Sequence, residues 1–352
     1  MTRQTTRRRF VAGVGTLAAG SAAGCSGSES PATETEASPT DASGGAEPSP
    51  GTGTATEADG AADTETATTD GGAVETLVSI GGDRVPENMA FGPEGALYFG
   101  ITAGELRRVP AEQTGATGLT LDDTEQVATL PGAIGVETGP DGTAYVAVAT
   151  QDDRAGVWSV TPEGDASQLT SISGFPNDIL FDAERDRLLV TESQGGVVYA
   201  VTTDGERTTW LDDDRLDTES FGANGLTRDA DGTVYVAVTR AANETGRLVR
   251  VPVESDGTAG EASTFLEGGS IFGADGITAR GGDIYVAANS QNRVVRVTPD
   301  GATSTVADAD DGLVFPSDVL FGTGERSDSL FICNFANQSP EDGAILRTTV
   351  TD

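Results

Sequence analysis

Four oxygen-bearing side chains occupy one matching position in four copies of a repeated segment. They are Glu87, Asn177, Asn224 and Asp275. Carboxylate and amide oxygens suit a hard cation, and a cage of several protein ligands suits Ca²⁺ better than Mg²⁺. The chain has no histidine and only two cysteines, which makes zinc and copper poor candidates. We therefore expect these residues to bind one divalent cation, with Ca²⁺ as the best fit.

The same residues also have a simpler interpretation as turn residues. Asn224 and Asp275 are each followed by glycine, which makes a common turn dipeptide. Most Asp-Gly pairs of this chain fall between strands inside a repeat, whereas these two precede the innermost strand in phase with Glu87 and Asn177. The agreement in phase favours a functional cation site. The alternative is that these residues only cap turns or hold a purely structural calcium.

The repeat occurs six times between Val74 and the end of the chain. Each copy runs from a four-residue opening into a turn and a short apolar strand, and the central residues of these strands lie 44 to 50 positions apart. The openings are Pro86-Glu87-Asn88-Met89, Ala133-Ile134-Gly135-Val136, Pro176-Asn177-Asp178-Ile179, Ala223-Asn224-Gly225-Leu226, Ala274-Asp275-Gly276-Ile277 and Pro316-Ser317-Asp318-Val319. A repeat of this length, built from short strands, is typical of a β-propeller blade.

Each copy is expected to form four strands, separated by turn residues such as Asp-Gly. In the first copy they are residues 89–91, 96–101, 105–109 and 126–130. The sixth copy ends after residues 344–350 without a fourth strand, and a spare segment, residues 75–80, precedes the first copy. We expect this segment to complete the sixth blade and close the ring. The predicted fold is all-β, a six-bladed β-propeller with four strands per blade over residues 74–352.

This fold places the four oxygen residues together. Each precedes the innermost strand of its blade, so we expect a loop to carry each of them at one mouth of the central channel. The symmetry of the ring converges such positions on the axis. The two remaining copies carry Ile134 and Ser317 at this position, and these are expected to shape the pocket.

The composition excludes several classes of partner. The formal net charge is −35, with 56 acidic and 21 basic residues, and nucleic acid and anionic membranes need cationic contacts instead. The charge favours solubility, as in a high-salt habitat, over an acidic binding surface. We expect a monomer that acts on a small molecule.

The N-terminal segment is similar to an export signal. Residues 6–11 resemble a twin-arginine motif, and a 13-residue apolar run, residues 11–23, is too short to span a bilayer. It ends in Ala-Ala-Gly-Cys, which resembles a lipobox with Cys25 as the lipidated residue. We expect residues 1–25 to be a twin-arginine lipoprotein signal that leaves the protein on the outer face of the cytoplasmic membrane, held there through Cys25 alone. A cleaved signal with an incidental cysteine is the alternative.

A spacer is expected between the signal and the propeller. Residues 26–73 are rich in Thr, Glu, Ser and Pro and have no aromatic residue, so they cannot bury enough apolar surface to order the chain. We expect a disordered linker. The other cysteine, Cys333, lies in a strand of the sixth copy and is expected to be a small buried apolar residue.

The propeller resembles the SMP-30/gluconolactonase/LRE family of six-bladed calcium-dependent lactonases, which is also related to phosphotriesterases. Glu87 in Pro-Glu-Asn, Asn224 in Ala-Asn-Gly-Leu and Asp275 in Ala-Asp-Gly-Ile match the family's metal ligands, and Asn177 in Pro-Asn-Asp matches a further site Asn. The resemblance implies calcium-dependent hydrolysis of a lactone or related ester, with the metal polarising the carbonyl. It also implies that Asp275 is both a ligand and the general base or nucleophile.

The chain departs from the family at the substrate positions. Sugar-lactone members typically carry an Arg two residues before the third-blade Asn, where this chain has Phe175. The metal site therefore transfers better than the substrate does. Glu192, Asn289 and Asn334 end the second strands of their copies, and with Phe175 they are candidates to contact substrate or to face solvent.

Two alternative functions stay open. A phosphotriesterase would use the same metal and the same Asp275 on another substrate. A non-catalytic surface propeller would bind a ligand or a protein partner, with a structural metal at most. Since the chain lacks histidine, propeller chemistries that depend on it are disfavoured: quinone-dependent sugar dehydrogenases, paraoxonase-like dyads and streptogramin lyases.

Overall fold

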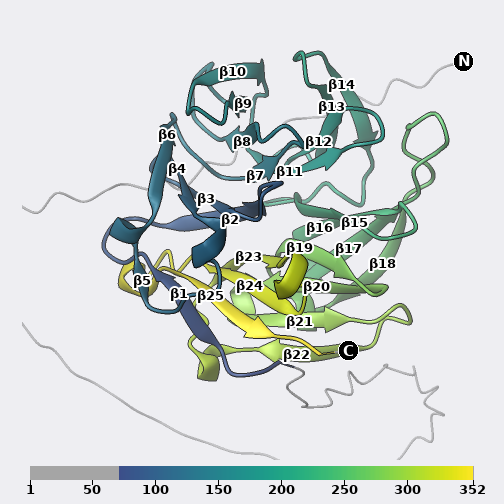
Figure 1. Cartoon of the computed structure of the whole chain (residues 1–352). Helices are drawn as coiled ribbons and strands as arrows, with labels where there is room; N and C mark the ends of the chain where they lie inside the picture. Colours follow the sequence, from purple (N-terminus) through teal and green to yellow (C-terminus); the bar gives the residue numbers. More distant parts are fainter. Residues whose placement is uncertain (1–70, 352) are drawn as a thin grey trace, which may run out of the picture. The chain divides into compact units, whose positions relative to one another are not determined.

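A computed structural model describes residues 71–351 of the chain. The predicted export signal, the lipidation at Cys25 and nearly all of the predicted linker lie outside the described residues. The described part forms six β-sheets arranged as blades around a common centre (Figure 1). The predicted six-bladed propeller is confirmed. None of the helices within residues 71–351 has the length and apolar character needed to span a membrane.

The first three blades each have four strands. Blade 1 contains β2 (Pro86–Phe91), β3 (Leu97–Ile101), β4 (Glu105–Val109) and β6 (Glu125–Thr129). Blade 2 contains β7 (Val136–Thr138), β8 (Ala144–Val148), β9 (Gly156–Val160) and β10 (Ala166–Ser171). Blade 3 contains β11 (Pro176–Asp182), β12 (Arg187–Glu192), β13 (Val197–Thr202) and β14 (Arg207–Asp212).

The other three blades continue the same order. Blade 4 contains β15 (Ala223–Arg228), β16 (Val234–Ala241), β17 (Thr245–Val251) and β18 (Ser263–Gly268). Blade 5 contains β19 (Ala274–Arg280), β20 (Asp283–Ala288), β21 (Arg293–Val297) and β22 (Thr303–Ala307). Blade 6 contains β23 (Pro316–Phe321), β24 (Ser329–Asn334), β25 (Ala344–Thr349), β1 (Glu75–Ser79) and β5 (Leu119–Thr120).

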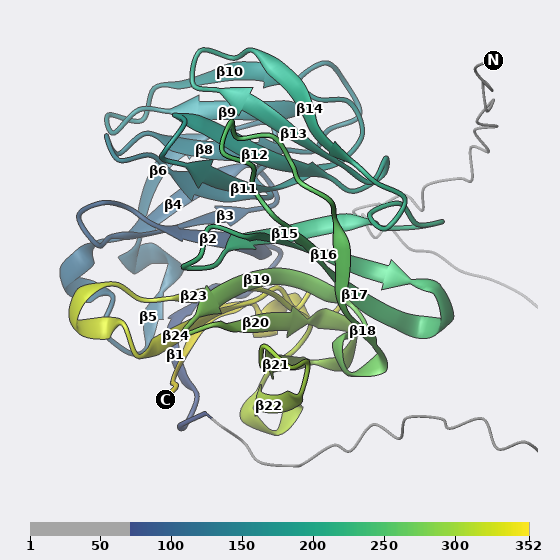
Figure 2. The same cartoon turned by 90° about the vertical axis from the view of Figure 1, so that its right-hand side faces the viewer.

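Short 3₁₀ helices occupy several of the connections. Within the described residues they are η1 (Ala111–Gln113), η2 (Leu121–Asp123), η3 (Ala242–Glu244), η4 (Gly269–Ile271), η5 (Asn289–Gln291), η6 (Ala309–Asp311), η7 (Gly324–Arg326) and η8 (Pro340–Asp342). The first strand of every blade lies nearest the centre, and the last strand lies at the periphery (Figures 1 and 2).

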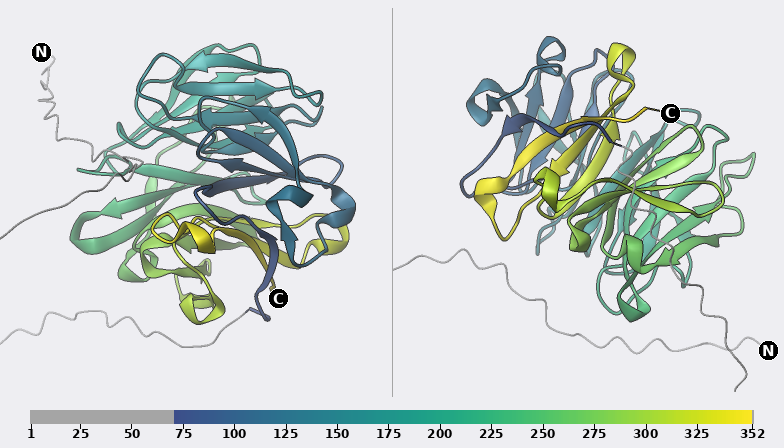
Figure 3. Two further views of the ribbon diagram at one scale, coloured as in Figure 1. Left: turned by 90° about the vertical axis from the view of Figure 1, so that its left-hand side faces the viewer. Right: turned by 90° about the horizontal axis from the view of Figure 1, so that it is seen from below.

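The two ends of the propeller close the ring in blade 6. Strand β1 pairs antiparallel with β25, from Glu75 opposite Arg347 to Ser79 opposite Ala344. In Figure 3 strand β1 lies beside the last strands of the chain. This confirms the predicted closure by residues 75–80. The two-residue strand β5 adds to β1 in parallel, so this blade has five strands where the sequence predicted four.

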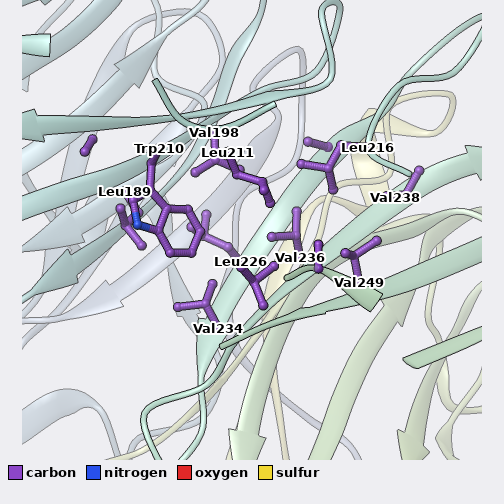
Figure 4. Packing of buried hydrophobic residues seen from close by; sticks show 14 residues of the cluster. Leu189, Val198, Trp210, Leu211, Leu216, Leu226, Val234, Val236, Val238 and Val249 are labelled. Atoms are coloured by element: carbon purple, nitrogen blue, oxygen red, sulfur yellow. The ribbon is translucent and has the colours of Figure 1, made fainter. Parts of the chain in front are cut away.

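The second strand of each blade is buried on both faces, because each blade packs between two neighbours. Every residue of β3, β8 and β20 is buried. Between blades 3 and 4, Leu189 and Trp210 pack against Leu226 and Val236 in a continuous apolar cluster (Figure 4). Burying a large apolar side chain stabilises a fold by roughly 1.5–3 kcal/mol, so these layers hold the ring rigid around its axis. Cys333 on β24 is likewise buried, as predicted.

Candidate metal centre and active site

Irregular register in the innermost strands positions the candidate ligands. In β2 the pairing with β3 shifts between Pro86 and Met89, and equivalent shifts occur at the starts of β11, β15, β19 and β23. The predicted ligand position falls inside this shifted stretch in each of these strands. Bulges occur next to active sites, where they re-aim side chains. The sequence predicts loops ahead of the strands for the four candidate ligands. In the structure they lie within the strands, because the irregular pairing extends the strands to include them: Glu87, Asn177, Asn224 and Asp275.

Both asparagine amides are oriented by hydroxyl groups of their own blades. Asn177 Nδ2 donates to Ser193 Oγ at 2.9 Å, and Asn224 Nδ2 donates to Thr239 Oγ1 at 2.9 Å. Both asparagines are buried, with 3% and 5% exposure. Because the amino groups have these partners, the amide oxygens are the atoms left to act as ligands.

The two carboxylates of the set lie in a shared electrostatic environment. Burial, more than the nearby Asp275, Asp318 and Asp178, raises the pKa of Glu87 well above its usual value. Burial also raises the pKa of Asp275 to about 7, against hydrogen bonds from Asn289 and Asn224 that lower it. The Glu87 side chain keeps some exposure, whereas Asp275 is only 6% exposed. A buried anion that is held close to other anions favours either a proton or a bound cation.

Within residues 71–351, no arginine forms a hydrogen bond, or an ion pair with an N–O distance of 4.0 Å or less, with Glu87 or Asp275. In the same range, no three Asp, Glu, His or Cys side chains are grouped so that they could hold a metal ion by themselves. The predicted set has two carboxylates and two amides, so it requires no such group. The hydroxyl groups engage the amide nitrogens of this set and not the amide oxygens. These oxygens and the two carboxylates fit a hard cation such as Ca²⁺.

A second ring of residues, one position further along the inner strands, links the blades. Asn88 Oδ1 accepts from Val136 N at 3.0 Å, and Asn88 Nδ2 donates to Asp178 Oδ1 at 3.2 Å. Asp178 Oδ2 in turn accepts from Leu226 N at 2.9 Å. These bonds connect blades 1 to 2, 1 to 3 and 3 to 4, and they tie together three of the four strands that carry the candidate ligands, β2, β11 and β15.

The same ring continues through blade 6. Asp318 Oδ2 accepts from Met89 N at 2.9 Å, and Ser317 Oγ donates to Glu87 O at 2.5 Å. Burial raises the pKa of Asp178 to about 6 and raises the pKa of Asp318 well above its usual value. These two buried aspartates add to the negative field around Glu87.

Sequence reasoning missed Asn88, Asp178 and Asp318. A signal was present, because this position holds a polar residue in blades 1, 3 and 6 and glycine in blades 2, 4 and 5. Glycine is needed where neighbouring blades approach closely: a Cβ at Gly135 would lie 2.1 Å from Asn177 O, and one at Gly276 would lie 2.2 Å from an Asp318 oxygen.

Of the predicted substrate residues, Asn289 lies at the site. Its Nδ2 donates to Asp275 Oδ2 at 2.7 Å, and its Oδ1 accepts from Ser290 Oγ at 2.8 Å. Asn289 is 4% exposed. It therefore positions the Asp275 carboxylate directly.

Glu192 and Asn334 hold backbone instead. Glu192 accepts from Phe175 N at 2.7 Å through Oε1 and from Gly195 N at 2.8 Å through Oε2. Asn334 Oδ1 accepts from Val314 N at 2.7 Å. Contact of either side chain with substrate stays a prediction. Phe175 is half-buried beside the third-blade ligand position, as its sequence position requires.

A separate cavity lies at the opposite ends of the inner strands. It measures about 410 Å³ between blades 1 and 6, and its lining includes Phe91, Glu94, Thr114 and Arg326. None of the predicted site residues lines it. The predicted site residues therefore lie apart from this cavity.

Comparison with known proteins agrees with the architecture. The Strictosidine synthase-like, N-terminal family matches residues 75–109, a small part of the chain. No curated protein sequence matches the chain.

Several solved propellers share the fold. A gluconolactonase from Xanthomonas campestris is 16% identical with a TM-score of 0.59, covering 79% of this chain and 89% of its own. An auxiliary nutrient binding protein from Bacteroides thetaiotaomicron is 12% identical with a TM-score of 0.60, covering 78% and 75%. The PQQ-bound aldose sugar dehydrogenase from Streptomyces coelicolor is 15% identical with a TM-score of 0.59, covering 80% and 98%. One fold thus serves a hydrolase, a binding protein and a dehydrogenase, so function must be argued from the site.

Proposed function

We propose that this protein is a calcium-dependent hydrolase of a lactone or a related ester. The observation that carries the proposal is the grouping of amide and carboxylate side chains where the inner strands begin. There, two buried amides have their amino groups engaged by hydroxyls, beside carboxylates whose pKa values are raised by burial and by nearby aspartates. The shared fold with a gluconolactonase supports the same reaction class.

Glu87, Asn177, Asn224 and Asp275 would hold the cation. When bound, Ca²⁺ supplies Lewis-acid polarisation of an ester carbonyl and stabilisation of the oxyanion. The four side chains come from four different blades. The bonds between blades fix their spacing before substrate arrives, so the oxygen ligands need little rearrangement.

Asp275 is the group that we assign to proton transfer. The chain has no histidine, so a carboxylate must accept the proton of an attacking water. Asn289 Nδ2 donates to Oδ2 of Asp275 at 2.7 Å, which fixes one oxygen of that carboxylate. Asn289 acts as a positioning residue because it fixes the plane of that carboxylate.

A hydrolysis assay tests this function. The full chain is incubated with a panel of lactones and aryl esters, then with a Ca²⁺ chelator, and then with Ca²⁺ restored. We expect turnover that the chelator abolishes and Ca²⁺ recovers, and a Glu87→Ala variant that stays inactive throughout. Turnover that ignores the chelator would contradict the metal mechanism. A phosphotriester in the same panel distinguishes the phosphotriesterase alternative.

A binding propeller is the second candidate. The similarity to an auxiliary nutrient binding protein favours it, since that protein has the same fold at a TM-score of 0.60. In this case the mouth would hold a structural calcium and a ligand that is not turned over. Saturable ligand binding at the mouth, without hydrolysis of any ester, would select this candidate.

We also propose where the protein acts. The twin-arginine motif and the lipobox at Cys25 support export and a lipid anchor on the outer face of the cytoplasmic membrane. Mass spectrometry of the membrane-extracted protein tests this proposal. A lipid-modified N-terminal Cys25 is expected, and an unmodified N-terminus at another residue would refute it.

A further inference from the structure

Five half-buried phenylalanines gather at the mouth of the channel. Phe175, Phe221, Phe272 and Phe315 each lie one or two residues ahead of the inner strand of blades 3, 4, 5 and 6, and Phe335 follows β24. First strands begin at the mouth and second strands return to it, so all five belong to the same end of the ring as the candidate ligands. We call these five residues the aromatic collar.

Ring contacts join members of the collar, between blades 3 and 4 and within blade 6. Phe175 and Phe221 form an edge-to-face pair with centroids 4.9 Å apart, and Phe315 and Phe335 lie 6.0 Å apart. The guanidinium of Arg240 lies 5.8 Å from the centre of the Phe272 ring. The collar thus covers four consecutive blades. The matching positions of blades 1 and 2 hold Val85 and Gly132 and carry no aromatic ring.

Polar side chains fix the backbone that carries the collar. The Glu192 carboxylate accepts from Phe175 N at 2.7 Å, and Asn292 Oδ1 accepts from Phe315 N at 2.8 Å. Phe315 has a φ of 48°, which is costly for a bulky residue and which a fold retains only where its surroundings enforce it. The buried Glu192 and the half-buried Asn292 therefore hold the backbone that presents two partly exposed rings.

We propose that the aromatic collar selects lactones or esters with an aromatic or extended apolar substituent and disfavours polyhydroxylated sugar lactones. The inference rests on the proposed hydrolase function and names its substrate class. Phenyl rings offer apolar surface and edge-to-face stacking but no hydrogen bond to a sugar hydroxyl. A polyol that entered this rim would lose water without gaining partners, which costs affinity.

Three substrates of similar ring chemistry test the selection. They are dihydrocoumarin, which carries an aryl ring, unsubstituted δ-valerolactone, and D-glucono-δ-lactone, which carries hydroxyls. With the Ca²⁺-loaded full chain, we expect kcat/KM for dihydrocoumarin to exceed that for the sugar lactone by about 100-fold or more, a ratio that a few contacts can supply. Equal or greater kcat/KM for the sugar lactone would overturn the inference.

Collar variants locate the selection. In Phe175→Ser and Phe221→Ser, kcat/KM for dihydrocoumarin should fall about 10-fold or more, mainly through a higher KM. The value of kcat/KM for δ-valerolactone should change little. Phe175→Leu keeps the apolar volume, so its kcat/KM for dihydrocoumarin should fall less. Phe265→Ser is the matched control, because Phe265 on β18 is also half-buried and forms an edge-to-face pair, at 5.3 Å with Tyr235, but lies at the periphery. An equal loss in the control would refute a specific role for the collar.

A binding measurement separates this inference from the hydrolase function. The lactam analogue of dihydrocoumarin resists hydrolysis, and its binding is followed by titration calorimetry. Lactam binding that Phe175→Ser weakens, without turnover of any ester, would refute the hydrolase function and support the collar. If the protein neither binds the lactam nor prefers the aryl lactone, the collar proposal is refuted.

Discussion

Buried aspartates at the two ends of the inner strands have opposite surroundings. Asp182, at the last position of β11, is fully buried and pairs with Arg228, Arg187 and Arg185 at N–O distances of 2.8, 2.9 and 3.4 Å. Burial alone would raise the pKa of Asp182, but the bonds from Arg228 and Arg187 outweigh it and lower the pKa. At the mouth, burial raises the pKa of Asp275 to about 7, and no arginine of the described chain pairs with it.

The difference shows that this fold can neutralise a buried carboxylate with its own cations. It does so where three arginines surround Asp182, and it does not do so at the mouth. The negative charge of Glu87 and Asp275 must therefore be balanced by protons or by a cation from solution. At neutral pH and in the presence of Ca²⁺, a divalent cation is the better counter-ion for several oxygen ligands.

Removing the Asp275 charge should have the largest effect. Asp275→Asn keeps the shape of the side chain but cannot accept a proton, so we expect kcat/KM to fall about 10³-fold, or about 4 kcal/mol in activation free energy. Steady-state kinetics on a lactone that the wild type turns over provides the measurement. A loss below about 10-fold would show that another group accepts the proton.

Neutralising Asp182 should reduce stability and spare activity. Asp182→Asn leaves Arg187 and Arg228 without their counter-ion, and breaking such a buried pair costs about 3 kcal/mol in unfolding free energy. Urea unfolding measures the change, with Asp152→Asn, in the exposed pair with Arg154, as a control that should not change. If Asp182→Asn lowered kcat/KM as strongly as Asp275→Asn, the two ends would not differ in function.

Removing the cation should destabilise the wild type at pH 8. A ligand at 100 times its dissociation constant stabilises the folded state by about 2.7 kcal/mol, so a chelator should lower the unfolding free energy by about that amount. The comparison is made by urea unfolding with and without Ca²⁺. Glu87→Ala should show no difference between the two conditions. An equal response in Glu87→Ala would assign the effect to cations elsewhere on this acidic chain.

A smaller effect is expected for Glu137 on β7 of blade 2. Burial raises its pKa to about 7, against bonds from Thr138 N and Phe181 N that lower it. A carboxyl whose pKa is higher in the folded state stabilises fully below its unfolded pKa, near 4.5, and this contribution is lost as the pH rises through 7. Glu137→Gln stays neutral, so we expect it to gain about 1–2 kcal/mol over the wild type at pH 8 and nothing at pH 4.5. Urea unfolding at both pH values checks this, and a pH-independent difference would contradict it.

The sequence was sufficient to predict the ring and its closure. Turn dipeptides and apolar runs repeat at nearly constant spacing, and the missing last strand of the sixth copy matched the spare segment 75–80. The two-residue strand β5 could not be predicted, because its parallel pairing with β1 depends on the assembled ring.

The candidate site was predicted in part. The repeat phase selected Glu87, Asn177, Asn224 and Asp275, but not the buried neighbour Asp178. In regular strands, successive residues point to opposite faces, so simple alternation would direct Asp178 away from Asn177. The shifted register of β11 removes that alternation.

Two other side chains make contacts that the sequence did not predict. Glu192 and Asn334 end strands near the mouth and were expected to contact substrate or to face solvent. In the structure they accept hydrogen bonds from backbone N–H groups of neighbouring loops. Loop conformation decides which donors reach a strand end, and local sequence does not encode it.

The stoichiometry of Ca²⁺ binding tests the central claim most directly. The full chain is freed of metal with a chelator, exchanged into metal-free buffer at pH 8 and titrated with Ca²⁺ in a calorimeter. One high-affinity Ca²⁺ per chain is predicted, lost in Glu87→Ala and retained in Asp182→Asn under conditions where both variants are folded. Absence of that site in the wild type, or its persistence in Glu87→Ala, would contradict the account.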